Sequence, residues 1–220
     1  MSPPAVAPTR PELPEQLEQL ELATLEHDIR LAELELSGGS LVDQRARGVT
    51  LQTMRLAGTD LSGSQLEHVR ILDSVLSSCN VANVNARGAR LKGVVIEDSR
   101  LTGMSLFEGE LTDVTFHGCR IDLASLSSCG MQRVRFEDCV LTQTDFMEAH
   151  LESVAFHGCE LTNGDFRGAK LKRCELRRSA LTGVQGVESL RGLAMEWPDI
   201  VELAGVWAGA LGIEVLEPGD

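Results

Sequence analysis

The chain has 220 residues, a length that suits one domain with modest extensions, and 43% of them are hydrophobic, which is enough to form a buried core. Its formal net charge is −13, which taken alone argues against a nucleic-acid-binding protein and fits a mimic of nucleic acid. No stretch approaches the roughly 20 apolar residues that span a bilayer, and the apolar segment of a signal peptide is missing from the N-terminus. We therefore expect a cytoplasmic protein. The preference for Arg over Lys is a feature of high-GC bacterial genomes.

The first 36 residues divide into two parts. The first 18 residues contain five prolines, and we expect residues 1–11 to be disordered. Residues 12–36 are acidic and Leu-rich, with Leu13, Leu17 and Leu20 at near-helical spacing. This spacing predicts a helix or another leading cap.

From Leu41 to Leu181 every fifth residue is apolar, without exception over 29 positions. Neither the 3.6-residue period of an α-helix nor the two-residue period of a strand produces this series. The position two residues before an apolar anchor is small in most repeats, and all six cysteines fall there. The position two residues after it is rich in glycine, which fits a tight corner. The series predicts a solenoid over residues 37–184.

The last segment, residues 185–220, is expected to be a helical cap. Pro198 suits the first turn of a helix, and Gly212 suits its end. One apolar stripe lies between them, formed by Ile200, Leu203, Val206, Trp207 and Leu211. Because the ends of a solenoid expose apolar core and unpaired strand edges, we expect this helix to cover the last coil.

Several five-residue units resemble the A-(D/N)-L-x-x repeat of the pentapeptide-repeat protein family. The matching units are Thr59-Asp60-Leu61-Ser62-Gly63, Thr144-Asp145-Phe146-Met147-Glu148 and Gly164-Asp165-Phe166-Arg167-Gly168. The resemblance runs from about Gly38 to Val184. It implies an all-β fold, a right-handed quadrilateral β-helix with four repeats in each 20-residue coil. About seven coils would then form a rod about 35 Å long.

In that fold the anchors face inward. The expected core anchors include Leu61, Leu101, Phe116, Phe136, Phe146, Phe156 and Phe166. Phe116, Phe136 and Phe156 lie 20 residues apart, so we expect them to stack on one face, with Phe146 and Phe166 stacked opposite. Phe107 and Met147 take outward positions, where they would contact a partner or the N-terminal segment.

The same geometry arranges polar and sulfur-containing residues in columns. Cys119, Cys139 and Cys159 would point inward on successive coils, where four ligands cannot converge on zinc, so we expect buried free thiols. His117 and His157 would flank Glu137 on the surface, about 10 Å apart, which favours a charge ladder over a metal or acid–base site. No phosphate loop, zinc-protease motif or serine-hydrolase motif occurs. We therefore expect no catalytic, metal-binding or cofactor-binding residues.

Two functions remain open. The first is a non-catalytic protein-binding or scaffold module with an unknown partner, and with no direct contact to nucleic acid or membrane. The second is a DNA mimic that binds DNA gyrase or another type II topoisomerase, as several family members do. Residues 37–184 carry 18 acidic and 17 basic residues, so the acidity lies in the flanks and not along the rod. In some members the C-terminal helix forms a dimer, so a homodimer through Leu203, Val206 and Trp207 competes with the capping role.

Overall fold

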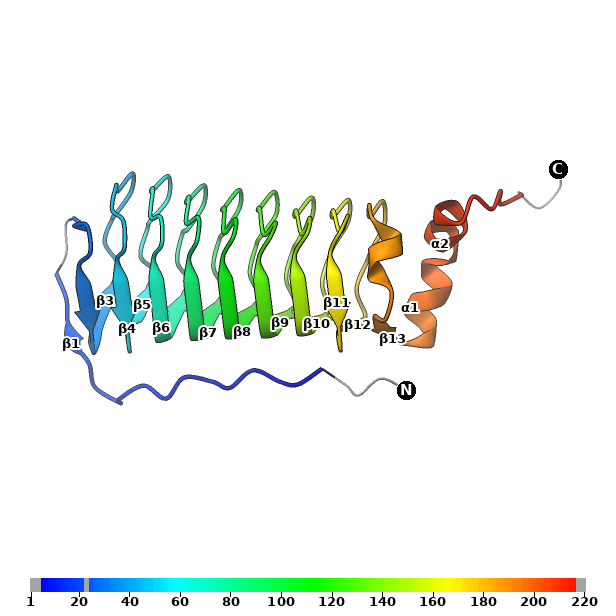
Figure 1. Cartoon of the computed structure of the whole chain (residues 1–220). Coiled ribbons are helices and arrows are strands. Elements are labelled where there is room, and N and C mark those ends of the chain that lie inside the picture. The colour runs from blue at the N-terminus through cyan, green and yellow to red at the C-terminus, as the bar shows by residue number, and fades with distance from the viewer. Residues whose placement is uncertain (1–4, 22–23, 217–220) are drawn as a thin grey trace.

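The computed structural model describes residues 5–21 and 24–216, which form one parallel β-solenoid with two short helices at its C-terminal end (Figure 1). The strands are β1 (Glu18–Gln19), β2 (Arg30–Ala32), β3 (Leu34–Ser37), β4 (Thr50–Gln52), β5 (Arg55–Ala57), β6 (Arg70–Ser77), β7 (Arg90–Glu97), β8 (Glu110–His117), β9 (Gly130–Glu137), β10 (His150–His157), β11 (Lys170–Lys172), β12 (Glu175–Arg177) and β13 (Ala194–Met195). The all-β solenoid predicted from the five-residue series is confirmed. Within the described residues, no helix is both long and apolar enough to cross a bilayer.

Successive coils are offset by 20 residues, so that Leu76 pairs with Ile96 and Ile96 with Phe116. We name the four faces after the anchors of one coil: face 1 contains Leu101, face 2 Leu106, face 3 Leu111 and face 4 Phe116. Strands β6–β10 each cover face 3 and then face 4. On faces 1 and 2, successive coils are joined by isolated β-bridges between residues that are 20 positions apart.

The corners lie two residues after each anchor, as the glycine-rich positions predicted. Every fifth residue from Asp28 to Gly183 has a positive φ, between 46° and 73°. Glycine adopts this left-handed conformation without strain, and Asp and Asn tolerate it better than other residues do. A corner after every fifth residue closes each coil into a square.

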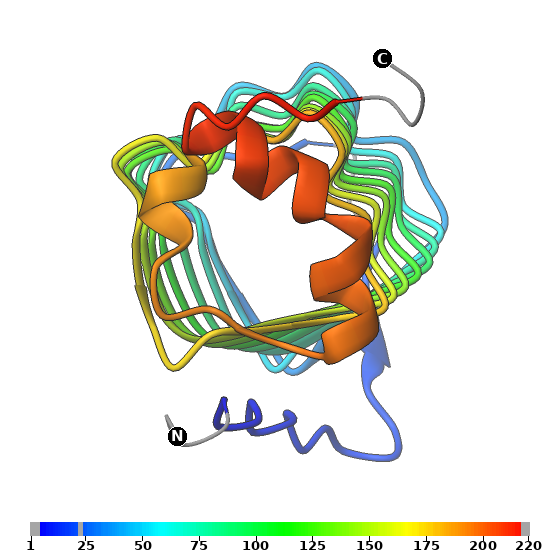
Figure 2. The same ribbon diagram turned by 90° about the vertical axis from the view of Figure 1, so that its right-hand side faces the viewer.

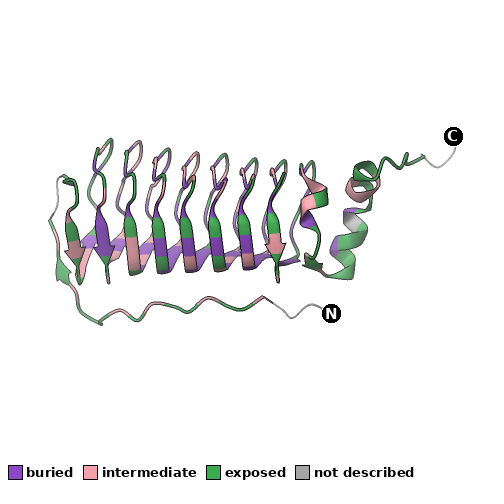
Figure 3. Ribbon diagram, viewed as in Figure 1, coloured by how far each residue is buried: buried purple, intermediate pink, exposed green. Residues whose placement is uncertain are grey.

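The anchors fill the interior (Figure 3). All 29 are buried except Ile71, Val81 and Leu171, which are partly exposed but still pack against the core. Two aromatic stacks form as predicted. The rings of Phe116, Phe136 and Phe156 are 4.8 and 5.1 Å apart, and those of Phe146 and Phe166 are 4.7 Å apart.

The N-terminal segment differs from the prediction. Residues 12–21 and 24–36, the described part of this segment, contain no helix; β2 and β3 instead form an additional coil that pairs with β4 and β5. Leu31 and Leu36 continue the five-residue series, and the exposed edges of β4 and β5 provide hydrogen-bond partners that an isolated helix would leave unused. With this coil and β13, the face 4 ladder has nine rungs from Leu36 to Met195, where about seven coils were expected.

Residues 5–17 are described as an extended segment, although residues 1–11 were expected to be disordered; residues 1–4 of that prediction lie outside the described part. We call residues 5–17 the N-terminal strap. The strap runs back along the axis of the rod, next to face 4 (Figures 1 and 2).

At the other end, a 3₁₀ helix η1 (Val187–Leu190), α1 (Trp197–Glu202) and α2 (Ala204–Ala210) lie across the last coil (Figure 2). Pro198 lies in the first turn of α1, and Gly212 follows α2 with φ 70°, as predicted. The single helix expected here is instead broken at Leu203, which leaves the helical region with φ −93° and ψ 4°. The break lets the chain turn while Leu203 stays buried.

Candidate interaction surfaces

The six cysteines are free and buried. Cys119, Cys139 and Cys159 occupy equivalent positions in successive coils, and each thiol points to a carbonyl of the preceding coil. Burial raises the pKa of the Cys129 thiol to about 12 and also raises the pKa of Cys79. Such thiols are protonated at neutral pH, which makes them poor nucleophiles and poor metal ligands.

The predicted surface column on face 4 is also present. Glu97, His117, Glu137, His157 and Arg177 are paired in this order across adjacent strands. His117 Nδ1 lies 3.8 Å from Glu137 Oε2, as a charge ladder requires. His157 instead bonds to Glu175, with its Nε2 2.8 Å from Glu175 Oε1. No group of three His, Cys, Asp or Glu side chains among the described residues is arranged to hold a metal ion.

Ion pairs neutralise several of the acidic side chains along the coils. Arg133 contacts both carboxylate oxygens of Asp113 at 2.7 Å, and this pairing lowers the pKa of Asp113. Further pairs join Arg55 to Glu35, Arg90 to Glu110, Lys172 to Glu152, Arg120 to Asp122 and Arg87 to Glu108. Acidic and basic groups are therefore mixed on the rod.

Face 3 carries a shallow groove of about 460 Å³ across β8–β11. It opens at Gly130, which has no side chain between Glu110 and His150 in the same column. The rims combine acidic and basic groups, including Glu152 with Lys172. The groove was not predicted, although the single glycine in an outward column was a readable signal for it.

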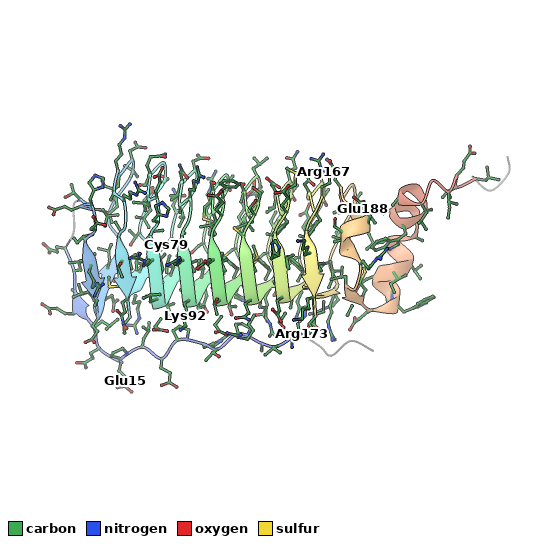
Figure 4. The ribbon with its side chains drawn as sticks, viewed as in Figure 1. Glu15, Cys79, Lys92, Arg167, Arg173 and Glu188 are labelled. Atoms are coloured by element: carbon green, nitrogen blue, oxygen red, sulfur yellow. The ribbon has the colours of Figure 1, made fainter. Side chains whose placement is uncertain are left out.

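Face 4 is covered, unlike face 3. Its outward residues Val95, Thr115 and Ala155 have exposed fractions of 5%, 4% and 2%, although they point away from the core. The strap lies along this face, with Glu15 on its outer side (Figure 4). Lys92 on β7 and Arg173 at the corner between β11 and β12 lie on the neighbouring coils. The Thr9 amide of the strap donates to Asp113 Oδ1 at 3.1 Å.

The C-terminal segment exposes a further set of side chains, two in α1 and four at or after the end of α2. We call them the C-terminal apolar surface, and each is at least 56% exposed: Trp197, Val201, Leu211, Ile213, Val215 and Leu216. Elsewhere in the described chain, apart from Ile200 beside this surface, the exposed large hydrophobic residues are Val6, Val42 and Leu123. Large exposed apolar patches on soluble proteins commonly mark sites of interaction.

Comparison with known proteins agrees with this architecture. Residues 109–185 match a family model described as a pentapeptide repeat region. This region of the chain is similar to the pentapeptide-repeat family. A search of curated proteins found no match.

Three solved structures of other proteins are similar to this chain at low identity. HetL, a pentapeptide repeat protein involved in heterocyst differentiation regulation from the cyanobacterium Nostoc sp. strain PCC 7120, is 20% identical, with 77% of this chain and 90% of that chain covered and a TM-score of 0.47. QnrB1, a plasmid-mediated fluoroquinolone resistance protein, is 17% identical in a trypsin-treated form, with 91% and 98% covered and a TM-score of 0.38. Rfr23 from the cyanobacterium Cyanothece 51142 is 18% identical, with 56% and 91% covered and a TM-score of 0.31.

The interface residues predicted from the sequence take different positions around the pentapeptide-repeat rod. Leu203 is buried, and Val206 and Trp207 are half-buried against the core, so all three help to cover the last coil. Phe107 is half-buried under the guanidinium of Arg87, 5.1 Å from its ring centre, and Met147 is also half-buried. A partner role for these five residues stays a prediction.

The exposed residues of the C-terminal apolar surface were missed, apart from Leu211, which had been assigned to the buried stripe. Trp197 precedes the predicted helix, and Ile213 and Val215 follow it. The break at Leu203 rotates α2 relative to the predicted stripe and leaves Leu211 76% exposed. The density of large apolar residues after Gly212 was the signal that could have revealed this surface.

Proposed function

We propose that the chain is a non-catalytic protein-binding module, a rigid β-helical rod that uses the C-terminal apolar surface to bind another protein. The observation that supports this proposal most directly is that six large apolar side chains, all at least 56% exposed, lie within residues 197–216. A protein partner would remove these side chains from water, which stabilises association by about 25 cal/mol for each Å² of apolar surface buried.

The charge near this surface favours a protein over a membrane as the partner. Residues 185–220 carry seven acidic residues and one basic residue. Anionic lipid surfaces attract clusters of Lys and Arg and repel acidic segments. A partner with basic groups around an apolar centre would fit both the charge and the exposed side chains.

Site-specific photo-crosslinking tests the proposal. A photoreactive amino acid is placed at Trp197, at Leu211 or, as a matched control on face 1, at Val42, which is 40% exposed. In cells that produce the chain naturally, we expect the same discrete protein to be captured from positions 197 and 211 but not from position 42. Identical products from all three positions would contradict the proposal.

Self-association is the competing role of the same surface. Sedimentation velocity of the purified chain distinguishes the two, and we expect a monomer at micromolar concentration. A dimer abolished by Trp197→Glu would assign the surface to a second copy of the chain and overturn the partner proposal.

The alternative of a DNA mimic that binds gyrase depends on dense, unpaired negative charge along the rod. Here the coils carry nearly as many Arg and Lys as acidic residues, and several acidic side chains are paired with them, as in Arg90–Glu110 and Arg133–Asp113. We expect no inhibition of gyrase supercoiling and no protection from a fluoroquinolone at micromolar protein. Inhibition that the purified chain causes reproducibly would support the mimic instead.

A further inference from the structure

Face 4 differs from face 3 in chemistry as well as in burial. In the coils that contain β6, β7 and β8, the first outward column of face 3 is charged, whereas that of face 4 is small or apolar. The face 3 column contains Arg70, Arg90 and Glu110, and the face 4 column contains Val75, Val95 and Thr115, with Arg55 before them and Arg135 after them. Face 4 therefore presents a short, weakly polar stretch over β6–β8 with a charged side chain at each end.

The strap that lies along face 4 has a three-residue pattern. Pro8, Pro11 and Pro14 recur at every third position. Ala5, Pro8 and Pro11 are half-buried, whereas the intervening Val6, Ala7, Thr9 and Arg10 are exposed; the burial period ends there, because Pro14 is exposed and Leu13 is half-buried. A side chain facing the same way at every third residue is the geometry of the polyproline II helix, which prolines favour.

The period of this helix matches the spacing of the coils. One polyproline II turn advances about 9.3 Å, and two coils advance about 9.6 Å. The two hydrogen bonds between the strap and the coils agree with this spacing. Pro14 O accepts from Arg55 and the Thr9 amide donates to Asp113, so five strap residues extend over three coils. Successive prolines can therefore meet equivalent positions on alternate coils without strain.

The strap is held by few polar contacts. Among the described residues, those two hydrogen bonds connect it to the coils, with lengths of 3.5 Å from Arg55 and 3.1 Å to Asp113. A polyproline II backbone makes no internal hydrogen bonds and is solvated when free. Release of the strap therefore leaves no unsatisfied backbone group, and another segment of the same conformation can take its place.

We propose that face 4 is a docking surface for proline-rich segments of another protein with the pattern P-x-x-P, and that the N-terminal strap, through Pro8 and Pro11, is its intramolecular occupant. The residue after the first proline donates its amide to Asp113, as Thr9 does, while the prolines lie on Val95 and its neighbours in the column. Arg133 fixes the Asp113 carboxylate through its two contacts. The exposed Arg10, Glu12 and Glu15 of the strap play no part in recognition. This surface is separate from the C-terminal apolar surface.

A peptide titration on the full chain tests the proposal. The probe is a fluorescein-labelled peptide with the sequence of residues 5–16, and the control peptide has glycine at its three proline positions. The protein is either the wild type or the double variant Pro8→Gly/Pro11→Gly, whose strap competes less well. In fluorescence anisotropy we expect the proline peptide to bind the double variant at least tenfold more tightly than the wild type. Absence of binding to both proteins, or equal binding of the glycine peptide, would overturn the proposal.

Substitutions on face 4 test whether the peptide binds there. Introduced into the double variant, Val95→Lys is expected to weaken peptide binding at least tenfold, and Asp113→Ala roughly tenfold because a charged hydrogen-bond acceptor is lost. Thr112→Lys, on the uncovered face 3, is the matched control and is expected to leave affinity unchanged. Circular dichroism shows that each variant is folded. Equal effects at positions 95 and 112 would contradict docking on face 4.

A second copy of the chain could supply the strap instead of a partner protein. Sedimentation velocity over a range of concentrations detects this exchange. We expect the wild type to stay monomeric. Dimers that disappear in Pro8→Gly/Pro11→Gly would show that the strap exchanges between copies and would overturn the assignment to a different protein.

Discussion

At the scale of single residues, the corners follow a rule that links one coil to the next. At several corners an Asp or Asn side chain lies against a glycine 20 residues later. A Cβ atom would be 2.6 Å from Asp98 Oδ1 at Gly118 and 2.3 Å from Asp138 Oδ1 at Gly158. Glycine is therefore required at these corners for two reasons: its φ is positive, and the carboxylate of the preceding coil occupies the position of a Cβ atom.

Gly118→Ala is expected to lower the free energy of unfolding by about 1–2 kcal/mol, through strain at positive φ and contact with Asp98. Denaturant titration measures this change. In an Asp98→Gly background the contact is absent, so the same substitution should cost less. An equal loss of unfolding free energy in the two backgrounds would show that backbone strain alone causes the effect and that the contact with Asp98 contributes nothing.

The ion pairs predict how stability depends on pH. The contact with Arg133 lowers the pKa of Asp113 in the folded chain, and Arg167 lowers that of Asp165. A carboxyl group whose pKa is lowered by folding stabilises the folded chain at pH values above its pKa in the unfolded chain. This stabilisation is lost as the pH falls through the pKa of the folded chain. We expect the melting temperature to fall below about pH 4, and to fall less steeply in Asp113→Asn than in the wild type. Identical slopes would contradict a stabilising role for this pair.

At the scale of elements, the two halves of the solenoid differ in how well they are filled. The Phe stack on face 4 begins at Phe116, and a cavity of about 60 Å³, lined by apolar side chains alone, lies between Leu25 and this ring. Anchors beside the cavity, such as Leu61 and Leu66, keep 7% exposure, whereas Leu141 and Leu161 keep none. Aliphatic anchors in a coil of this width do not meet at its centre.

Ile96→Phe is expected to raise the free energy of unfolding by about 1 kcal/mol, because a ring at this position extends the stack beside Phe116 into the cavity. Thermal and denaturant unfolding measure the change. Leu126→Phe is the matched control: Leu126 is fully buried in the filled half, so overpacking should destabilise this variant by about 1–3 kcal/mol. Loss of stability in both variants would show that the cavity cannot accept a ring.

The five-residue series predicted the elements of the rod well because it is a local consequence of coil geometry. Anchors, corners and aromatic stacks all follow from position within the repeat. The series did not reveal the first coil, since Glu26 and Glu21 interrupt it and Leu13, Leu17 and Leu20 mimic a helix. The pairing of β2 and β3 depends on the edges of β4 and β5, 20 residues away in the sequence, and composition does not report such contacts.

The surfaces were harder to predict than the core. The strap was not predicted from the sequence, although Pro8, Pro11 and Pro14 recur at every third position. This spacing becomes informative only once the weakly polar side chains of face 4 are known to lie beside the segment. The C-terminal apolar surface depends on the break at Leu203, where the backbone leaves helical geometry for a tertiary contact. An uninterrupted helical pattern cannot indicate that break.

At the scale of the whole molecule, the rod depends on its closed ends. Leu190 and Leu203 are buried at the C-terminal end, and the amide of Arg178 donates to the buried carboxylate of Asp199 at 3.1 Å. These contacts cover the last anchors and orient α1 and α2. Without them the last coil would present apolar residues and free strand edges to other copies.

Leu203→Asp is expected to open this end, so that the variant associates end to end and elutes at a higher mass by size exclusion with light scattering. The buried charge also destabilises the folded chain. Val201→Asp, on the exposed side of α1 at 57% exposure, is the control and should behave as the wild type. Association in both variants, or in neither, would contradict a capping role for Leu203.

The uneven filling of the interior also bears on how the rod responds to force. Each coil contacts mainly the coils beside it, so a pulling load is resisted one coil at a time. The coils from Phe116 onward are held by stacked rings, whereas those before it surround a cavity. Under tension between its two termini, we expect the coils that precede Phe116 to unfold first, while the coils from Phe116 onward stay folded.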